Sequence, residues 1–145
     1  MSKLPNMPRC VAIVICNDVI EDKRSSNKTL VGLFNQIMVQ HLPTKHQRFF
    51  LFLCLAEFAG RAELTIGINS PSRELLRLSG AINSTDYNAT ADLVVELQGL
   101  PLEEPGRHRI DVQVDGVSIA DRSFIVSLAP PTGTHPGPTG VIGGA

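Results

Sequence analysis

An acidic cluster follows the first apolar segment of the chain. Asp18, Glu21 and Asp22 lie close together, and carboxylate oxygens are the ligands that Ca²⁺ prefers. Loops of β-sandwich domains can bind the ion in this way, but Ca²⁺ needs about six to eight oxygens. Further ligands would have to come from the same edge, where the candidates are Asp86, Asp115 and Asp121. Because Lys23 and Arg24 balance the cluster, a solvated loop is the ordinary interpretation.

The histidines and two pairs of arginines are the other polar groups that could bind a ligand. The four histidines fit no zinc-binding spacing: His41, His46, His108 and His135. His108 falls in the inward register of an alternating segment, which is typical of a hydrogen-bonded strand residue. The arginine pairs could face a carboxylate or phosphate, although a solvated strand face is the ordinary interpretation: Arg73 with Arg77, and Arg107 with Arg109.

Motifs for catalysis or cofactor binding are missing from the sequence. It contains no G-x-S-x-G, no G-x-G-x-x-G and no P-loop. Cys10, Cys16 and Cys54 are odd in number and lack C-x-x-C spacing, so they predict buried apolar side chains rather than a disulfide framework. We therefore assign no catalytic residue, cofactor or metal ligand, and we expect that the protein is not an enzyme.

Charge and hydropathy narrow the expected partners and location. Lys and Arg number 13 and Asp and Glu number 14, so the net charge of −1 creates no field that would gather phosphates. We expect no nucleic-acid partner. No apolar stretch is long enough to span a bilayer, and the N-terminus does not resemble a secretory signal. Together with the unpaired thiols, these features predict a cytoplasmic protein.

Short apolar or alternating segments separated by turn residues dominate the chain. In residues 61–68, Ala62, Leu64, Ile66 and Ile68 alternate with polar neighbours, which is the pattern of a half-buried strand. The predicted strands cover 11–15, 29–39, 49–56, 61–68, 75–82, 92–98, 107–114 and 117–126. With no convincing long helix, the pattern predicts an all-β fold, an antiparallel sandwich of about seven to eight strands that is immunoglobulin-like or C2-like.

A β-hairpin is the strongest local prediction. Residues 107–114 alternate, Asp115-Gly116 follows, and a second apolar run begins at Val117. An Asp-Gly pair between alternating segments favours a two-residue hairpin turn. The alternation breaks at Asp121-Arg122, where we expect a β-bulge.

Composition divides the chain into three parts. Residues 1–9 contain Pro5 and Pro8 and are predicted to be a flexible arm. Residues 10–128 form the sandwich domain. Residues 129–145 hold four Pro and five Gly, so they cannot bury enough surface to offset their ordering entropy, and we predict a flexible tail.

Two segments carry a resemblance to a known family. One runs Cys16-Asn-Asp-Val-Ile-Glu-Asp and continues, after a polar loop, with Lys28-Thr-Leu-Val-Gly-Leu-Phe34. The other is Pro105-Gly-Arg-His-Arg-Ile-Asp-Val-Gln-Val-Asp-Gly116. Over residues 10–127 the chain resembles small bacterial β-sandwich proteins of unknown function. The second segment is similar to one in immunoglobulin-like sandwiches, which often carry Tyr where this chain has His108. The resemblance implies a fold and no activity.

Two of the predicted strands are apolar on both faces. In 11–16, Val14 lies on the face opposite to Ile13 and Ile15, and in 49–53 Phe50 and Phe52 lie opposite to the other apolar residues. A two-layer sandwich buries one face of each sheet and leaves the other in water. The second face of these strands should therefore be covered, by a loop, by the tail or by a second subunit. We identify Val14, Phe50 and Phe52 as interface residues.

These observations favour a non-enzymatic sandwich module that acts through protein contacts and associates with itself. One alternative is a Ca²⁺-dependent or membrane-binding C2-like module that uses the acidic cluster. The other is a carrier of a small ligand, with the surplus apolar side chains lining a pocket between the sheets.

Overall fold

Nine β-strands make up the fold that the computed structural model describes, which comprises residues 7–130. The predicted flexible arm 1–9 and tail 129–145 lie mostly outside these residues. Within the arm, Pro8 is buried and Arg9 already belongs to the first strand. The strands are β1 (Arg9–Glu21), β2 (Lys28–Leu33), β3 (Gln36–Val39), β4 (Thr44–Ala56), β5 (Gly60–Asn69), β6 (Glu74–Ser84), β7 (Ala91–Leu102), β8 (Gly106–Val114) and β9 (Val117–Leu128).

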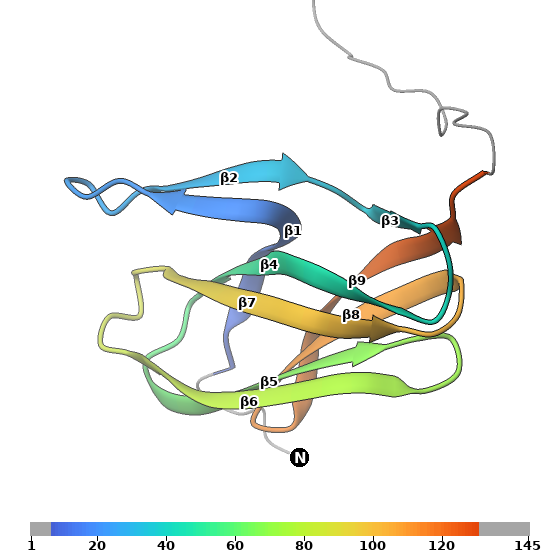
Figure 1. Cartoon of the computed structure of the whole chain (residues 1–145). Helices are drawn as coiled ribbons and strands as arrows, with labels where there is room; N and C mark the ends of the chain where they lie inside the picture. The colour runs from blue at the N-terminus through green and yellow to red at the C-terminus, as the bar shows by residue number, and fades with distance from the viewer. Residues whose placement is uncertain (1–6, 131–145) are drawn as a thin grey trace, which may run out of the picture.

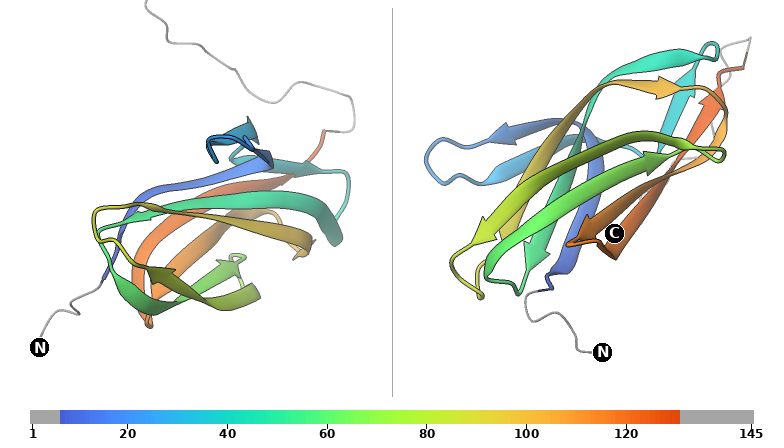
Figure 2. Two further views of the ribbon diagram at one scale, coloured as in Figure 1. Left: turned by 90° about the vertical axis from the view of Figure 1, so that its left-hand side faces the viewer. Right: turned by 90° about the horizontal axis from the view of Figure 1, so that it is seen from below.

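The strands form two sheets with the apolar core between them (Figure 1). One sheet has the order β2-β1-β4-β7, and the other has the order β3-β9-β8-β5-β6. All neighbours pair antiparallel except β3 and β9, which are parallel. β1 bends strongly, so the first sheet is curled, and the hairpin of β1 and β2 projects beyond the other strands (Figure 2). The all-β, two-sheet expectation is confirmed.

The strand count exceeds the expected seven to eight because the predicted strand 29–39 is two strands. β2 ends at Leu33 and pairs with β1, whereas β3 begins at Gln36 and pairs with β9 in the other sheet. The chain changes sheets at Phe34 and Asn35, and the Asn35 carbonyl accepts a hydrogen bond from the Ile125 amide of β9. Local apolar character cannot show such a change of sheet, because both halves have strand-forming residues.

The inner faces of the long strands supply the core. Phe49, Leu51, Leu53 and Leu55 of β4 are fully buried, and the alternating apolar residues of β5 and β8 face them. The predicted alternation of β5 and β8 is therefore confirmed. Burying a side chain of this size stabilises the fold by about 1.5–3 kcal/mol relative to exposing it.

The Asp115-Gly116 hairpin forms as predicted between β8 and β9. Asp115 and Gly116 both have positive φ, 49° and 81°, which is the requirement of a two-residue type I′ turn. The bulge predicted at Asp121-Arg122 is wrong. Asp121 and Arg122 pair regularly with β8, and the extra residue is Ile119, between Ser118 and Ala120.

Arg122 disrupts the sequence alternation because a charged residue occupies an inward position. It lies opposite Ile110, whose side chain is fully buried. Its guanidinium donates from Nη1 to the Ile13 carbonyl at 3.1 Å and from Nη2 to the Phe34 carbonyl at 3.5 Å. Arg122 therefore connects β9 to β1 of the other sheet and provides partners for two main-chain carbonyls near the sheet change.

Candidate functional site

The outward side of the β2-β1-β4-β7 sheet is apolar at its centre. Val14 of β1 lies directly opposite Phe52 of β4, and Phe52 lies opposite Val94 of β7. Residues paired in this way project from the same face of a sheet. Because Leu51 and Leu53 point into the core, Phe52 and its partners point away from it.

The apolar surface continues across all four strands. Cys16 of β1 is opposite Phe50 of β4 on one side and opposite Leu33 of β2 on the other. Leu33 is 65% exposed and Val31 is 41% exposed, although both are large aliphatic residues. We call this surface the outer apolar face and define it by Val14, Val31, Leu33, Phe50, Phe52 and Val94.

The other sheet provides a comparison within the same molecule. The outward residues of its strands are mainly polar or charged: Arg61, Glu63 and Thr65 of β5, and Arg107, Arg109, Asp111 and Gln113 of β8. Several of them pair with one another, as Arg109 does with Asp111 and Asp121 at 3.7 Å. This sheet obeys the rule that one face is buried and the other is in water, whereas the outer apolar face does not.

Charged groups lie at the margin of the outer apolar face. The Arg48 guanidinium is 5.2 Å from the centroid of the Phe50 ring, a cation–π distance, and its Nη1 is 3.6 Å from a carboxylate oxygen of Glu96. At the opposite end, Cys54 is opposite Asp92. Burial raises the pKa of the Cys54 thiol, and the nearby Asp92 carboxylate raises it further. The thiol is therefore neutral at pH 7.

The three residues that the sequence identifies as an interface lie together in the structure. Val14, Phe50 and Phe52 belong to neighbouring strands of one face, and all three are half-buried within the chain. Leu33, Val31 and Val94 cannot be assigned to this face from the sequence, because their position depends on the pairing of β2 and β7 with distant strands.

The acidic residues considered as Ca²⁺ ligands are dispersed. Asp22 accepts hydrogen bonds from the Arg24 and Ser25 amides, which lower the pKa of its carboxyl group, and Glu21 pairs with Lys28 at 3.5 Å. Asp115 accepts from the Glu63 amide in a different part of the fold. Among residues 7–130, no three His, Cys, Asp or Glu side chains converge in a way that could hold a metal ion.

The described histidines have structural positions. His46 packs edge-on against Phe49 with centroids 5.4 Å apart, and burial lowers its pKa. His108 is fully buried, as its inward register predicts; its Nδ1 donates to the Gly106 carbonyl at 3.1 Å, and its ring packs against Phe124. His41 is exposed, and His135 lies outside the described residues.

Of the two arginine pairs considered as ligand-binding groups, Arg73 and Arg77 both form ion pairs within the chain. Arg73 forms a two-pronged contact with Glu103, its closest approach being 2.7 Å, and Arg77 does the same with Glu74. These pairs are exposed and lie on the turn side of β6, so they do not form a common anion site. Exposed pairs of this kind contribute little to stability.

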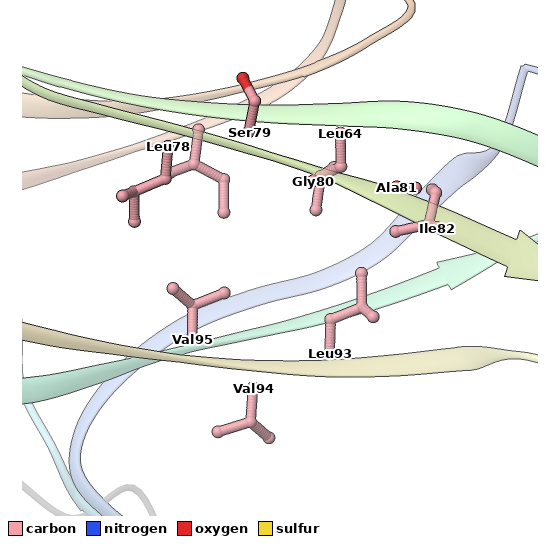
Figure 3. A pocket seen from close by; sticks show the side chains of 10 residues that line it. Leu64, Leu78, Ser79, Gly80, Ala81, Ile82, Leu93, Val94 and Val95 are labelled. Carbon is pink, nitrogen blue, oxygen red and sulfur yellow. The ribbon is translucent and has the colours of Figure 1, made fainter.

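A groove between the edge strands β6 and β7 is a second candidate site that the sequence analysis did not locate. Leu93 and Val95 of β7 point toward Leu78 and Ile82 of β6, and Val94 points away (Figure 3). The groove encloses about 270 Å³ and is lined mainly by aliphatic side chains. Gly80 is the residue in the sequence that indicates this groove. It occupies an inward position between Leu78 and Ile82 and leaves the space above Leu64 unfilled.

No helix in the part of the chain that the structure describes could cross a membrane. No curated protein matches the chain. Solved structures with some similarity include the Pseudomonas fluorescens alkylpurine DNA glycosylase AlkC bound to DNA containing an abasic site analog, with 14% identity and a TM-score of 0.43. Another is a β-glucosidase from Listeria innocua, with 12% identity and a TM-score of 0.42.

These two structural similarities are too weak to carry an argument. They cover 63% and 65% of this chain, which spans only 27% of the glycosylase and 15% of the glucosidase. The match to a sequence family covers more of the chain than these structures do: the family model matches residues 11–127, nearly the whole described fold. The expected relationship to proteins of unknown function is confirmed at this level: the chain belongs to the family of unknown function DUF6941.

Proposed function

We propose that this protein is a non-enzymatic β-sandwich module that works through protein contacts and associates with itself through the outer apolar face. One observation carries the proposal: the outward side chains of the two sheets differ in composition. The β5 and β8 side is charged and internally paired, whereas Val14, Phe50 and Phe52 lie with Leu33 and Val94 on one mainly apolar face.

Leaving this apolar surface in water has an unfavourable free energy. Removing apolar surface from water is favourable by about 25 cal/mol per Å². Contiguous apolar patches of several hundred Å² on a monomer are commonly binding sites. Phe50 and Phe52 are also suitable anchors, because aromatic side chains near the centre of an interface contribute a large share of its binding free energy.

Cys54 provides an internal probe for this proposal. It alternates with Phe50 and Phe52 along β4 and is half-buried at the end of the outer apolar face. Cys10 lies close enough to Cys54 to raise the pKa of the Cys54 thiol, so Cys54 is probed in a Cys10→Ser variant. If the face is an interface between copies, alkylation of Cys54 in this variant slows as the protein concentration rises, and the further substitution Phe52→Thr removes the concentration dependence. A rate that is independent of concentration in the Cys10→Ser variant would contradict the proposal.

A second candidate function is the binding of a small apolar ligand in the β6–β7 groove. The observation that favours it is the open space at Gly80, where a Cβ atom would meet no atom within 4 Å. The lining is aliphatic, and its volume of about 270 Å³ is near the lower end for ligand sites. A fluorescent fatty-acid analogue is a suitable probe.

The matched variants for the groove are Gly80→Leu and Ala81→Leu. A leucine at position 80 fills the groove, whereas position 81 pairs with Glu63 and faces away from it. Ligand binding in the groove predicts that Gly80→Leu abolishes the fluorescence change and that Ala81→Leu leaves it intact. Equal responses from the two variants would exclude the groove as the binding site.

We further propose that the fold is of the immunoglobulin-like type and that the protein is bacterial and cytoplasmic. The order β9-β8-β5 has the arrangement of strands G, F and C of an immunoglobulin domain, and β1-β4-β7 has that of A, B and E. The Asp-Gly hairpin and the Pro105-Gly106 segment support the same type. Three unpaired cysteines support a reducing compartment, and the resemblance of residues 10–127 supports a bacterial source.

A further inference from the structure

We infer that two copies of the chain pack their outer apolar faces antiparallel, with Arg48 of each copy next to Asp92 of the other. This inference rests on the proposed self-association and adds its geometry. The outer apolar face is covered by a second copy of this chain, and a twofold axis relates the two copies. A twofold interface is self-complementary, so each cross-contact occurs twice.

The charge distribution along β4 and β7 carries the argument. The outward residues of β4 are, in order, Arg48, Phe50, Phe52 and Cys54. Their partners on β7 are Gln98, Glu96, Val94 and Asp92. Arg48, paired with Glu96, therefore lies at one end of the face, the carboxylate of Asp92, which has no ion pair among residues 7–130, lies at the other end, and Phe50, Phe52 and Val94 lie between them. Arg48 and Asp92 are both exposed.

A twofold axis that lies in the plane of contact, perpendicular to the strands, brings the opposite charges of the two copies together. It reverses the strand direction, so the end of one face that carries Arg48 covers the end of the other face that carries Cys54 and Asp92. Phe50 of each copy then packs against Phe52 of the other. Aligned packing of two sheets keeps their strands within about 30° of each other, which this arrangement permits.

An axis parallel to the strands gives a less favourable result. With the axis over β4, the centre of the apolar residues, it would stack β4 on β4 at the same level, so Arg48 would face Arg48 of the other copy. Like charges brought together across an interface are destabilising. The charge complementarity thus selects the antiparallel arrangement over the parallel one.

The Arg48–Glu96 pair does not prevent the cross-contact. The Nη1 to carboxylate distance within the chain is 3.6 Å, and the side chains of Arg48 and Glu96 are 51% and 40% exposed. A guanidinium has five N–H donors, so Arg48 can keep Glu96 and also donate to a carboxylate of the second copy.

Charge reversal tests the arrangement directly. The dissociation constant of the full chain is measured by sedimentation equilibrium for the wild type, Arg48→Glu, Asp92→Arg and the double variant. We expect each single reversal to weaken association at least about tenfold and the double reversal to return it to within about threefold of the wild type. Arg61→Glu, on the outward side of the other sheet, is the control and should have no effect.

The outcomes separate this inference from the proposed function. If Phe52→Thr weakens association but the charge variants do not, or if the double reversal fails to restore it, the antiparallel arrangement is wrong and self-association through the face remains. A wild type that is monomeric at every concentration overturns both. Thermal unfolding of each variant shows whether a charge reversal impairs folding. If it does, the neutral variants Arg48→Gln and Asp92→Asn replace the reversals. Each should weaken association, and an unchanged dissociation constant would contradict the arrangement.

Discussion

Val14 and Phe52 lie opposite each other on β1 and β4, and both side chains project from the sheet on the side away from the core. Their neighbours Leu51, Leu53 and Ile15 are fully buried between the sheets. The central strands of this sheet are therefore apolar on both sides. A strand with this property needs a second covering layer, and within residues 7–130 Val14, Phe50 and Phe52 remain half-buried, although Cys16 beside them is fully buried.

Replacing Arg122 with Met should destabilise the fold by about 1–3 kcal/mol. The variant loses the hydrogen bonds to the Ile13 and Phe34 carbonyls, and a buried acceptor left without a partner costs roughly that much. Urea unfolding measures the change. Arg109→Met is the control: the Arg109 side chain is 56% exposed and its ion pairs with Asp111 and Asp121 are 3.7 Å long, so its loss should cost about 0–1 kcal/mol. Equal effects of the two substitutions would show that Arg122 does not connect the sheets.

Two glycine substitutions should have opposite effects. Gly80 has no left-handed backbone and has open space around it, so Gly80→Ala should stabilise the protein by about 0.5–1 kcal/mol. Gly116 has φ of +81° in the hairpin turn, where a side chain is strained, so Gly116→Ala should destabilise it by about 1–2 kcal/mol. Thermal or urea unfolding distinguishes the signs. Destabilisation by Gly80→Ala would mean that the groove is not open.

His46 should make the protein less stable in mildly acidic solution. Burial against Phe49 lowers its pKa from the ordinary 6.5, so the folded state takes up the proton less readily than the unfolded chain. The free energy of unfolding should therefore fall as the pH drops below about 6.5 and level off once the pH is below the lowered pKa. His46→Phe should remove this part of the pH dependence. An unchanged profile between pH 7 and 5 in that variant would contradict the assignment.

Glu104 should contribute a separate loss of stability in stronger acid. Its carboxylate accepts hydrogen bonds from the Ser72 and Ser70 hydroxyls at 2.9 and 2.8 Å, and these contacts lower its pKa below the ordinary 4.5. The stabilisation is present above about pH 4.5 and is lost as the pH falls through the lowered pKa.

Glu104→Gln should therefore reduce stability at pH 7 and flatten the acid limb of the stability profile. Glu63→Gln is the control, because the Glu63 carboxylate makes no hydrogen bond or ion pair among the described residues. Equal flattening by the two variants would mean that the serine contacts are not the cause.

The sequence predicts those parts of the fold that depend on neighbours along the chain. The alternation of β5 and β8 and the positive φ values at Asp115 and Gly116 follow from local patterns, and the structure has both. The position of Phe50 and Phe52 on one face also follows from the alternation of β4 alone, whereas Val14 joins them through the pairing of β1 with β4.

The remaining features depend on contacts between distant residues. Phe34 and Asn35 carry the chain from one sheet to the other, and nothing in their local sequence marks the crossing. Arg122 lies at an inward position because carbonyls of β1 and the β2–β3 connection accept its hydrogen bonds. Gly80 leaves a groove only because β6 and β7 are edge strands that face each other.

The most direct test of the outer apolar face as an interface is the molar mass in solution, measured by light scattering after size exclusion at two protein concentrations. We expect a wild-type mass near twice 15.7 kDa, a monomer for the Phe50→Thr/Phe52→Thr double variant, and a dimer for the control Ile125→Thr on β9. A wild type that stays monomeric at both concentrations, or a dimer that persists without Phe50 and Phe52, would contradict this expectation.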